Sequence, residues 1–264
     1  MFIFGTPEEI FGKFGDIAFA GLKDFSKIPN MGDGDIFDRI AMHGTTDVAI
    51  VNREGVIIAT DGRASAEHRI ATDDFEKMFL LDRYSIMAIA GVPLVGIPMA
   101  KMLRTRFSIE AYDHETIHLP TETKANFISQ MIRNNIGLAL AHKLIVEVLF
   151  ATFDNSSGSG RVFTIWPDGN HDPNLNYGSC GSGGNTAKLT LDILLRVLRK
   201  KPQDLSIGEA KGLIISALIE ANRVDSATGR RIYMKSITKS GVEDIGVEEI
   251  RELVATVENG GLLS

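Results

Sequence analysis

The strands and helices that the sequence predicts follow an order that few folds can accommodate. From residue 45 onward, short β-branched runs come first, and then a helical pair, two more strand runs, a second helical pair and closing strands. Short turns such as Arg53-Glu54-Gly55 and Asp82-Arg83 join neighbouring strands, which therefore pair antiparallel. The expected strands are 46–52, 56–60, 77–81, 84–90, 145–153, 161–166, 232–237 and 243–245, and the expected helices are 94–108, 121–143, 186–200 and 207–222. This order predicts an α+β fold, in which two antiparallel sheets pack face to face with helices outside as a four-layer αββα sandwich.

Residues 1–44 differ in composition from the rest of the chain. They contain seven of the fourteen phenylalanines, and their apolar side chains recur at roughly helical spacing. The segment is either an amphipathic helix of the core or a leader that docks on a partner and is later removed. Residues 45–264 contain no repeat and no low-complexity linker, so we expect them to form one domain.

Composition and charge exclude several classes of function. The net charge of −6 and the absence of a Lys/Arg cluster argue against a nucleic-acid partner. No run of about 18 apolar residues exists, and the first residues lack the basic region of a signal peptide. Cys180 is the single cysteine, which rules out an internal disulfide and fits a reducing compartment. We therefore expect a cytoplasmic protein with no membrane partner.

A threonine directly after a glycine begins the first predicted strand. If the bond between Gly44 and Thr45 is cut, the Thr45 hydroxyl becomes a nucleophile and the freed α-amine becomes its general base. An α-amine has a pKa of about 8, which suits a base at neutral pH. Glycine has no side chain to block attack of the hydroxyl on its carbonyl group. The tripeptide alone is also compatible with an ordinary strand start.

Three further residues fit this chemistry. Asp61 ends one apolar strand and Lys77 begins another, so a buried lysine could pair with this carboxylate and lower the pKa of a nearby amine. Gly91 closes a third apolar run, where its N–H can face a developing oxyanion. Each residue also has a purely structural interpretation, as a turn former, a counter-ion or a strand end.

Two other motifs do not suggest a cofactor or a metal. The segment Gly178–Asn185 is rich in glycine but fits neither a P-loop nor G-x-G-x-x-G, and it is not a nucleophile elbow. It leaves a serine on a tight turn. His114 and His118 are four residues apart, yet Pro120 and their polar neighbours indicate a solvated loop. We expect neither a cofactor nor a metal ion.

From His43 to about Gly241 the sequence resembles proteasome β subunits of the bacterial, actinobacterial type, which are N-terminal-nucleophile hydrolases of peptidase family T1. The resemblance is carried by motifs in matching order and spacing, namely His43-Gly44-Thr45-Thr46, Asp61-Gly62-Arg63-Ala64-Ser65, Glu76-Lys77, Ile89-Ala90-Gly91, Lys124-Ala125-Asn126, Gly181-Ser182-Gly183 and Asp225-Ser226-Ala227-Thr228-Gly229. It covers nearly the whole body of the chain.

The resemblance implies a role for each matching residue. Thr45 matches the catalytic N-terminal threonine, which is freed by autocatalytic loss of a propeptide, residues 1–44, that ends at the processing site Gly44. Asp61 and Lys77 match the charged pair beside the threonine, and Gly91 matches the oxyanion-hole amide. Ser182 and Asp225 match the residues around the threonine amine. Thr228 stands where many members have serine, and it keeps a hydroxyl.

The sequence departs from the family pattern at the expected substrate site. Ser65 ends a motif that often reads Gly-Asp-Arg-Arg-Ala-Thr, but its backbone groups remain available to an extended substrate. Pro93 replaces a small residue that donates a backbone N–H to the bound peptide, so we expect one substrate hydrogen bond of about 1 kcal/mol to be lost. Ala64, Phe75 and Ile89 would line the pocket for the residue before the scissile bond. Because all three are apolar, we expect cleavage after hydrophobic residues.

The resemblance implies a threonine endopeptidase that degrades unfolded proteins inside a ring assembly. Its implied partners are further copies of the chain in heptameric rings, α-type subunits and an ATP-dependent unfoldase. The alternatives are an HslV-like ring peptidase without α subunits, a non-catalytic ring subunit, and a non-peptidase amidohydrolase of the same superfamily.

Overall fold

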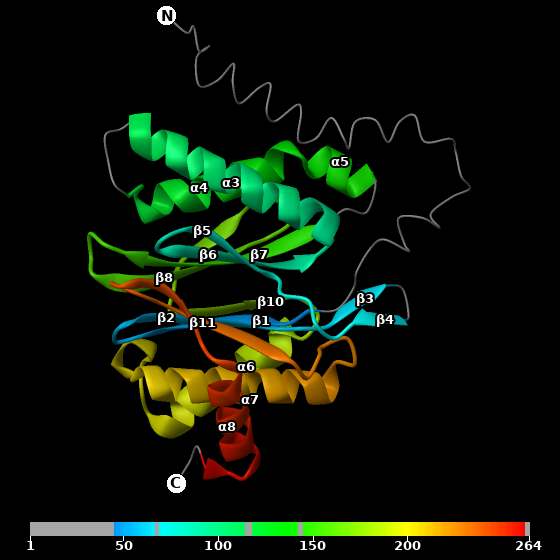
Figure 1. Cartoon of the computed structure of the whole chain (residues 1–264), viewed down its shortest axis with the longest axis vertical. Helices are drawn as coiled ribbons and strands as arrows, with labels where there is room; N and C mark the ends of the chain where they lie inside the picture. Colours follow the sequence, from blue (N-terminus) through cyan, green and yellow to red (C-terminus); the bar gives the residue numbers. More distant parts are fainter. Residues whose placement is uncertain (1–44, 67–68, 114–117, 142–144, 262–264) are drawn as a thin grey trace, which may run out of the picture.

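The computed structural model describes residues 45–66, 69–113, 118–141 and 145–261, and their helices and strands stack in four layers (Figure 1). Two five-stranded antiparallel sheets lie face to face in the middle. Helices α3 (Pro93–Asp113), α4 (Thr121–Asn134) and α5 (Ile136–Ala141) cover one sheet. Helices α6 (Gly184–Leu198) and α7 (Ile207–Val224) cover the other. The predicted α+β class and its αββα layers are confirmed.

The first sheet contains the strand that follows Thr45. Its order is β10-β1-β2-β11-β12, and every neighbouring pair is antiparallel. All residues of the interior strand β1 are buried, because helices cover its outer face and the second sheet covers its inner face. The strands are β1 (Asp47–Asn52), β2 (Gly55–Asp61), β10 (Tyr177–Cys180), β11 (Ile232–Thr238) and β12 (Gly241–Asp244).

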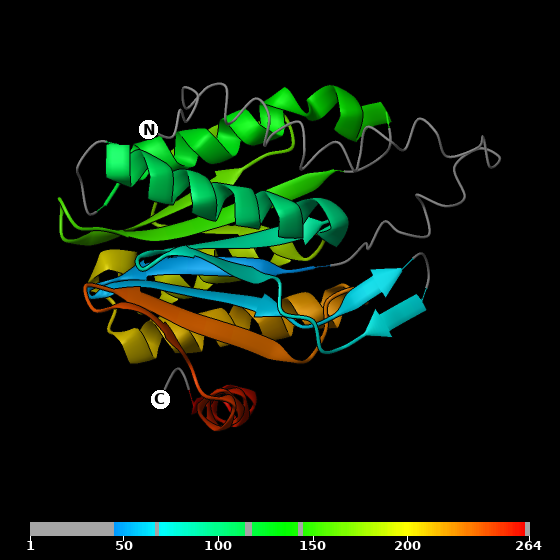
Figure 2. The same ribbon diagram turned by 45° about the horizontal axis from the view of Figure 1, so that its top comes forward.

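The second sheet runs in the order β5-β6-β7-β8-β9 and is also antiparallel throughout. Its strands are β5 (Met78–Asp82), β6 (Ser85–Gly91), β7 (Val146–Asp154), β8 (Ser159–Ile165) and β9 (His171–Leu175). A separate hairpin of β3 (Ala64–Ala66) and β4 (Arg69–Thr72) follows β2 and extends beyond the two sheets (Figure 2).

Three apolar layers hold the sandwich together, and strand alternation explains them. Ile57 and Ile58 are consecutive in β2 and both fully buried, yet Ile57 packs under α6 and α7 whereas Ile58 packs between the sheets. The third layer joins the second sheet to α3 and α4 through residues such as Leu103 and Ile128. Burial of this apolar surface on both faces of each sheet fixes the register of the strands.

Helix α7 begins at a capping box and ends at Asp225, one of the expected site residues. Ser206 accepts a hydrogen bond from the Glu209 amide at 3.3 Å, and the Glu209 carboxylate accepts one from the Ser206 amide at 2.9 Å. This capping box satisfies the helix N-terminus. The C-cap is Asp225, so the length of α7 sets the position of that carboxylate.

The helix expected over 121–143 is two helices, and that prediction is wrong in its extent. At Asn135 the side-chain amide donates to the Met131 carbonyl oxygen at 2.7 Å, and the backbone amide donates to the Ile132 carbonyl oxygen at 3.1 Å. These bonds close the last turn of α4 before α5 begins. The end of the predicted helix lies in 142–144, outside the described residues.

Several elements have no counterpart among the predicted ones. They are β3, β4, β9, β10 and the C-terminal helix α8 (Val247–Glu258), which packs against α7. The sequence of β10 is rich in glycine and serine, which favours a loop on composition alone. Pro173 lies inside β9, at the edge of its sheet, where a missing N–H is tolerated.

Residues 1–44 lie outside the described part of the chain, so neither interpretation of the phenylalanine-rich segment is tested there. None of the helices over the described ranges combines the length and apolar character needed to cross a membrane.

Candidate active site

Thr45 lies at the entry to β1, close to the turn that follows β10. Only 5% of its surface is exposed. The Thr45 amide nitrogen lies 3.4 Å from Ser182 Oγ, and the Thr45 carbonyl oxygen lies 3.5 Å from the same hydroxyl. The amide of Asp61 donates to the Thr46 carbonyl oxygen at 3.1 Å, which ties the residue after Thr45 to the end of β2. Gly44 lies outside the described residues.

The carboxylate of Asp61 accepts four hydrogen bonds in the interior. Its Oδ1 accepts from Lys77 Nζ at 2.9 Å and from the Thr46 amide at 2.7 Å. Its Oδ2 accepts from the amides of Arg63 and Gly229, both at 2.8 Å. The Asp61 side chain is fully buried and that of Lys77 is 5% exposed. The structure therefore brings this expected pair together, and a buried ion pair of this kind is stable only when its remaining lone pairs are also satisfied.

A second group of polar side chains joins the β10–α6 turn to the end of α7. Ser182 Oγ donates to Asp225 Oδ2 at 2.5 Å, and Thr228 Oγ1 donates to the same oxygen at 2.9 Å. Thr228 Oγ1 also lies 2.7 Å from Thr46 Oγ1. Partial burial raises the pKa of Asp225, but hydrogen bonds from Ser182, the Ala227 amide and Thr228 outweigh it, so that its pKa lies below the usual value. Asp225 is thus an ionised acceptor that orients Ser182 toward Thr45.

Two glycines in the β10–α6 turn permit the close approach of Thr45 and Thr46. Gly181 has φ +88°, and a Cβ there would lie 2.1 Å from the Thr45 carbonyl oxygen. A Cβ on Gly183 would lie 2.1 Å from Thr46 Oγ1. Because both spaces are filled by the chain around Thr45, these positions admit no side chain.

The backbone of Gly91 is turned toward the same region. The Ile89 amide donates to the Lys77 carbonyl oxygen at 3.3 Å, on the side of β6 that faces β5. Alternate residues of a strand direct their N–H groups to the same side, so the Gly91 N–H points past the start of β5, where Lys77 lies. Gly91 has φ +113°, and a Cβ would lie 2.3 Å from the Ile145 carbonyl oxygen. This geometry suits a backbone donor near the Lys77 end of β5.

The five expected substrate residues lie on different elements. Ala64 and Ser65 belong to β3, directly after the Asp61 loop, and the Phe75 amide donates to the Gly62 carbonyl oxygen at 3.0 Å. Ile89 is 5% exposed and packs in the apolar layer beneath α3. Pro93 is the first residue of α3, a position where a helix needs no N–H from its own residue.

Sequence reasoning missed the residues that complete the Asp61 site. Thr46, Arg63 and Gly229 donate backbone N–H groups to Asp61. A pattern of side chains in the sequence does not predict which backbone groups act as donors. Asp47 was also missed, although a charged residue inside an otherwise apolar strand is a usable signal.

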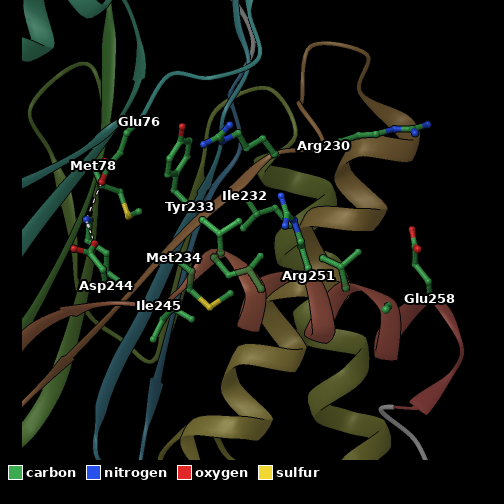
Figure 3. Close-up of a pocket in the computed structure, with 16 residues that line it drawn as sticks. Glu76, Met78, Arg230, Ile232, Tyr233, Met234, Asp244, Ile245, Arg251 and Glu258 are labelled. Carbon is green, nitrogen blue, oxygen red and sulfur yellow. Dashed lines mark hydrogen bonds and ion pairs between the residues drawn. The ribbon is translucent and has the colours of Figure 1, made fainter.

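A cavity of about 520 Å³ lies elsewhere, between β11, β12 and α8 (Figure 3). Among its lining residues, Lys235 pairs with Glu76 at 2.8 Å and with Asp244. None of Thr45, Asp61 and Ser182 lines it. The described residues also contain no group of three side chains suited to hold a metal ion, and His118 packs its ring edge-on against Tyr84 at 4.6 Å. His114 lies outside them.

Four αββα layers with a threonine at the head of a central strand define the class of N-terminal-nucleophile hydrolase folds. The comparisons with known proteins agree. The family model described as "Proteasome subunit" matches residues 41–237. The chain is 36% identical over 203 residues to a "Proteasome subunit beta" of Acidimicrobium ferrooxidans, covering 76% of this chain and 71% of the relative. It is 37% identical over 228 residues to one of Streptosporangium roseum, covering 83% and 77%. The chain belongs to the proteasome subunit family, among relatives named as β subunits.

Proposed function

We propose that this chain is a threonine endopeptidase of a proteasome-like core particle, with Thr45 as the nucleophile. The observation that supports this best is the contact of Ser182 Oγ with the backbone nitrogen of Thr45, because this nitrogen is the base in the proposed mechanism. Asp225 orients Ser182 by accepting a hydrogen bond from its hydroxyl group. The Asp61–Lys77 pair lies one residue away along the chain, on the Thr46 amide.

The proposed mechanism begins with removal of residues 1–44. The Thr45 hydroxyl attacks the carbonyl carbon of Gly44, an ester forms, and the Gly44–Thr45 amide bond breaks with transfer of a proton to the departing nitrogen. Water then hydrolyses the ester, which releases Gly44 as a carboxylate and leaves Thr45 with a free α-amine and hydroxyl. Residues 45–264 form the mature domain in this proposal.

The same hydroxyl then cleaves peptide substrates. The α-amine takes the hydroxyl proton during attack on the scissile carbonyl and gives it to the leaving amine. The positive charge of Lys77, fixed by Asp61, lowers the pKa of the amine through like-charge repulsion, so that it is unprotonated at neutral pH. The Gly91 N–H stabilises the oxyanion, and water hydrolyses the acyl ester to regenerate Thr45. Ser182, Asp225 and Thr228 keep the amine oriented.

The proposed function includes a mode of substrate binding and a mode of assembly. An extended peptide pairs with the backbone of Ser65, and Ala64, Phe75 and Ile89 form an apolar pocket before the scissile bond, whereas Pro93 offers no amide. The family assignment implies a ring-forming core particle with α subunits. We propose that it forms heptameric rings in the cytoplasm, which an ATP-dependent unfoldase supplies with unfolded proteins. An HslV-like particle and a non-catalytic ring subunit remain the competing proposals.

Substitution of Thr45 tests the proposal. In Thr45→Ala the hydroxyl is lost, so the assembled particle should keep the 264-residue form and show no hydrolysis of a fluorogenic peptide. Thr45→Ser keeps the hydroxyl and should process and cleave at a reduced rate. Intact-mass analysis distinguishes the precursor from a form that begins at Thr45. Assembled wild-type particles that retain residues 1–44 and lack peptidase activity would establish the non-catalytic alternative.

A further inference from the structure

A buried carboxyl group, Asp47, lies two residues after Thr45 and has no role in the mechanism above. Asp47 is the first residue of β1 and is fully buried. Its cross-strand neighbours are Cys180 of β10 and Thr60 of β2, of which Cys180 is 2% exposed and Thr60 is fully buried. The three side chains thus form a small polar group inside the sandwich.

Asp47 faces the space between the two sheets. Thr46 contacts Thr228 after α7, on the helix side of the sheet. Asp47 instead contacts Cys180, which belongs to the apolar layer between the sheets. Thr45 precedes Asp47 by two residues, which is about 7 Å along the chain. Asp47 is therefore a close neighbour of the proposed nucleophile on the side of the first sheet that faces the second.

Few hydrogen bonds reach the Asp47 carboxyl group. Cys180 Sγ donates to Asp47 Oδ2 at 3.2 Å, and a thiol is a weak donor. Within the described ranges, neither Asp47 Oδ1 nor Thr60 Oγ1 has a hydrogen-bond partner. Asp61, by contrast, accepts four hydrogen bonds. Hydrogen bonds therefore stabilise the charged form of Asp47 poorly.

The charges around Asp47 come from three other elements. Burial raises the pKa of Asp47 to about 7, opposed by the positive charge of Lys77 and the thiol of Cys180, and supported by the negative charges of Asp61 and Glu147. Glu147 of β7 accepts a hydrogen bond from the Gly181 amide at 3.0 Å, yet burial still raises its pKa. Burial raises the pKa of Cys180 well above its usual value, so the thiol stays neutral.

We infer that Asp47 is a positioning residue that acts through Lys77, because its buried carboxyl group changes the net charge near Lys77 as it gains or loses a proton. The inference rests on the proposed function of Thr45. When Asp47 is neutral, the charge of Lys77 acts on the Thr45 amine without opposition from Asp47. When Asp47 is ionised, a second negative charge offsets Lys77 and stabilises the ammonium form of the amine. The amine then becomes a base only at higher pH.

The pH profile of the mature particle tests this inference. Asp47→Asn keeps the shape of the side chain but cannot ionise. The acid limb of kcat/KM for a fluorogenic peptide should therefore move to lower pH, by about 0.5 to 1 unit for one charge at this separation. Asp204→Asn makes the same chemical change on the surface near the opposite end of β1 and should leave the limb in place. An acid limb that is unchanged in Asp47→Asn particles of normal activity would overturn the inference and leave the proposed function intact.

A second variant and a second readout separate charge from packing. Cys180→Ala removes the hydrogen bond that Asp47 receives from the Cys180 thiol, which favours the neutral form of Asp47, so the acid limb should move in the same direction by less.

Thermal unfolding gives an independent check, because the folded-state pKa of about 7 lies above the ordinary 3.8. The stability contributed by neutral Asp47 is complete below about pH 4 and is lost as the pH rises to about 7. The Tm of the wild type should thus fall relative to Asp47→Asn over that interval, and a constant difference would count against the inference. If the wild-type particle is itself unprocessed and inactive, the proposed function fails, and this inference fails with it.

Discussion

At the scale of single residues, the site is organised around Asp61. Its two oxygens accept hydrogen bonds from the residue before β1, from the loop after β2, from the residue before β5 and from the loop after α7. Segments distant in sequence are thereby joined at one carboxylate. The Lys77 charge contributes both to the stability of this group and to the proposed chemistry at Thr45, and a pair of substitutions can separate the two contributions.

Lys77→Met should lower the free energy of unfolding and abolish peptidase activity. The substitution leaves the Asp61 carboxylate buried without its counter-ion, which costs about 3 to 5 kcal/mol of unfolding free energy. Adding Asp61→Asn in the same chain removes the uncompensated charge and should recover part of that loss, because the Asn side chain can accept hydrogen bonds at only one of the two positions that Asp61 uses. Chemical denaturation measures the first effect, and peptide hydrolysis measures the second.

The double variant is the informative one. It should be more stable than Lys77→Met but inactive, since the charge of Lys77 no longer lowers the pKa of the Thr45 amine. Recovery of hydrolysis together with stability would show that the pair is purely structural. Lys124→Met provides a control at a second buried lysine, which pairs with Asp82 at 2.7 Å and should affect stability alone.

Part of this residue-level arrangement was predictable. Asp61 and Lys77 lie at the ends of apolar runs, where a buried charged residue needs an opposite charge. The sequence therefore predicts that the two residues pair. The pairing of Asp47 with Cys180 was not predictable, because it depends on the register between β1 and β10, which are separated by more than 120 residues. Ser182 and Asp225 were assigned by family resemblance and not by any local pattern.

At the scale of elements, the β10–α6 turn decides where Thr45 sits. Gly181 combines a positive φ of 88° with a carbonyl oxygen 2.1 Å from the position of a Cβ. Gly181→Ala should therefore displace Thr45 and reduce kcat/KM by about a hundredfold, the usual effect of moving a reacting group by about 1 Å. The measurement is peptide hydrolysis by the processed particle, corrected for the amount of mature chain.

Gly158→Ala is the matched control for the turn. Gly158 also has a positive φ, 66°, but a Cβ there would meet no atom within 4 Å. It should show the backbone strain, about 1 kcal/mol of stability, without loss of activity. Equal losses of activity in both variants would mean that strain, and not contact with Thr45, explains the effect.

The elements that sequence patterns missed are those whose structure depends on distant partners. Strand β10 has the composition of a loop and becomes a strand because β1 offers it an edge. The split between α4 and α5 depends on hydrogen bonds made by one residue, Asn135, within a continuous helical pattern. The strongly patterned elements β1, β2, α6 and α7 were predicted to within a few residues.

At the scale of the whole molecule, the layer order was predictable because short turns dictate antiparallel neighbours and apolar faces dictate stacking.

The proposed assembly makes a prediction about the composition of the particle. Native mass spectrometry of particles purified from the chain's own host should show equal numbers of this chain and an α-type subunit, with this chain beginning at Thr45. An HslV-like particle would contain copies of this chain alone, and that result would replace the proposed assembly.

The contacts of Ser182 with Thr45 have a consequence for how errors in synthesis are handled. They link the start of β1 to the β10–α6 turn, and Asp225 links that turn to the end of α7. On the proposed mechanism, self-cleavage needs all three segments in place, so a chain in which one is misplaced keeps its amine blocked. The cut is irreversible, so a chain that begins at Thr45 is a chain that has already folded. Misfolded copies of the protease therefore stay inactive and cannot cleave other proteins.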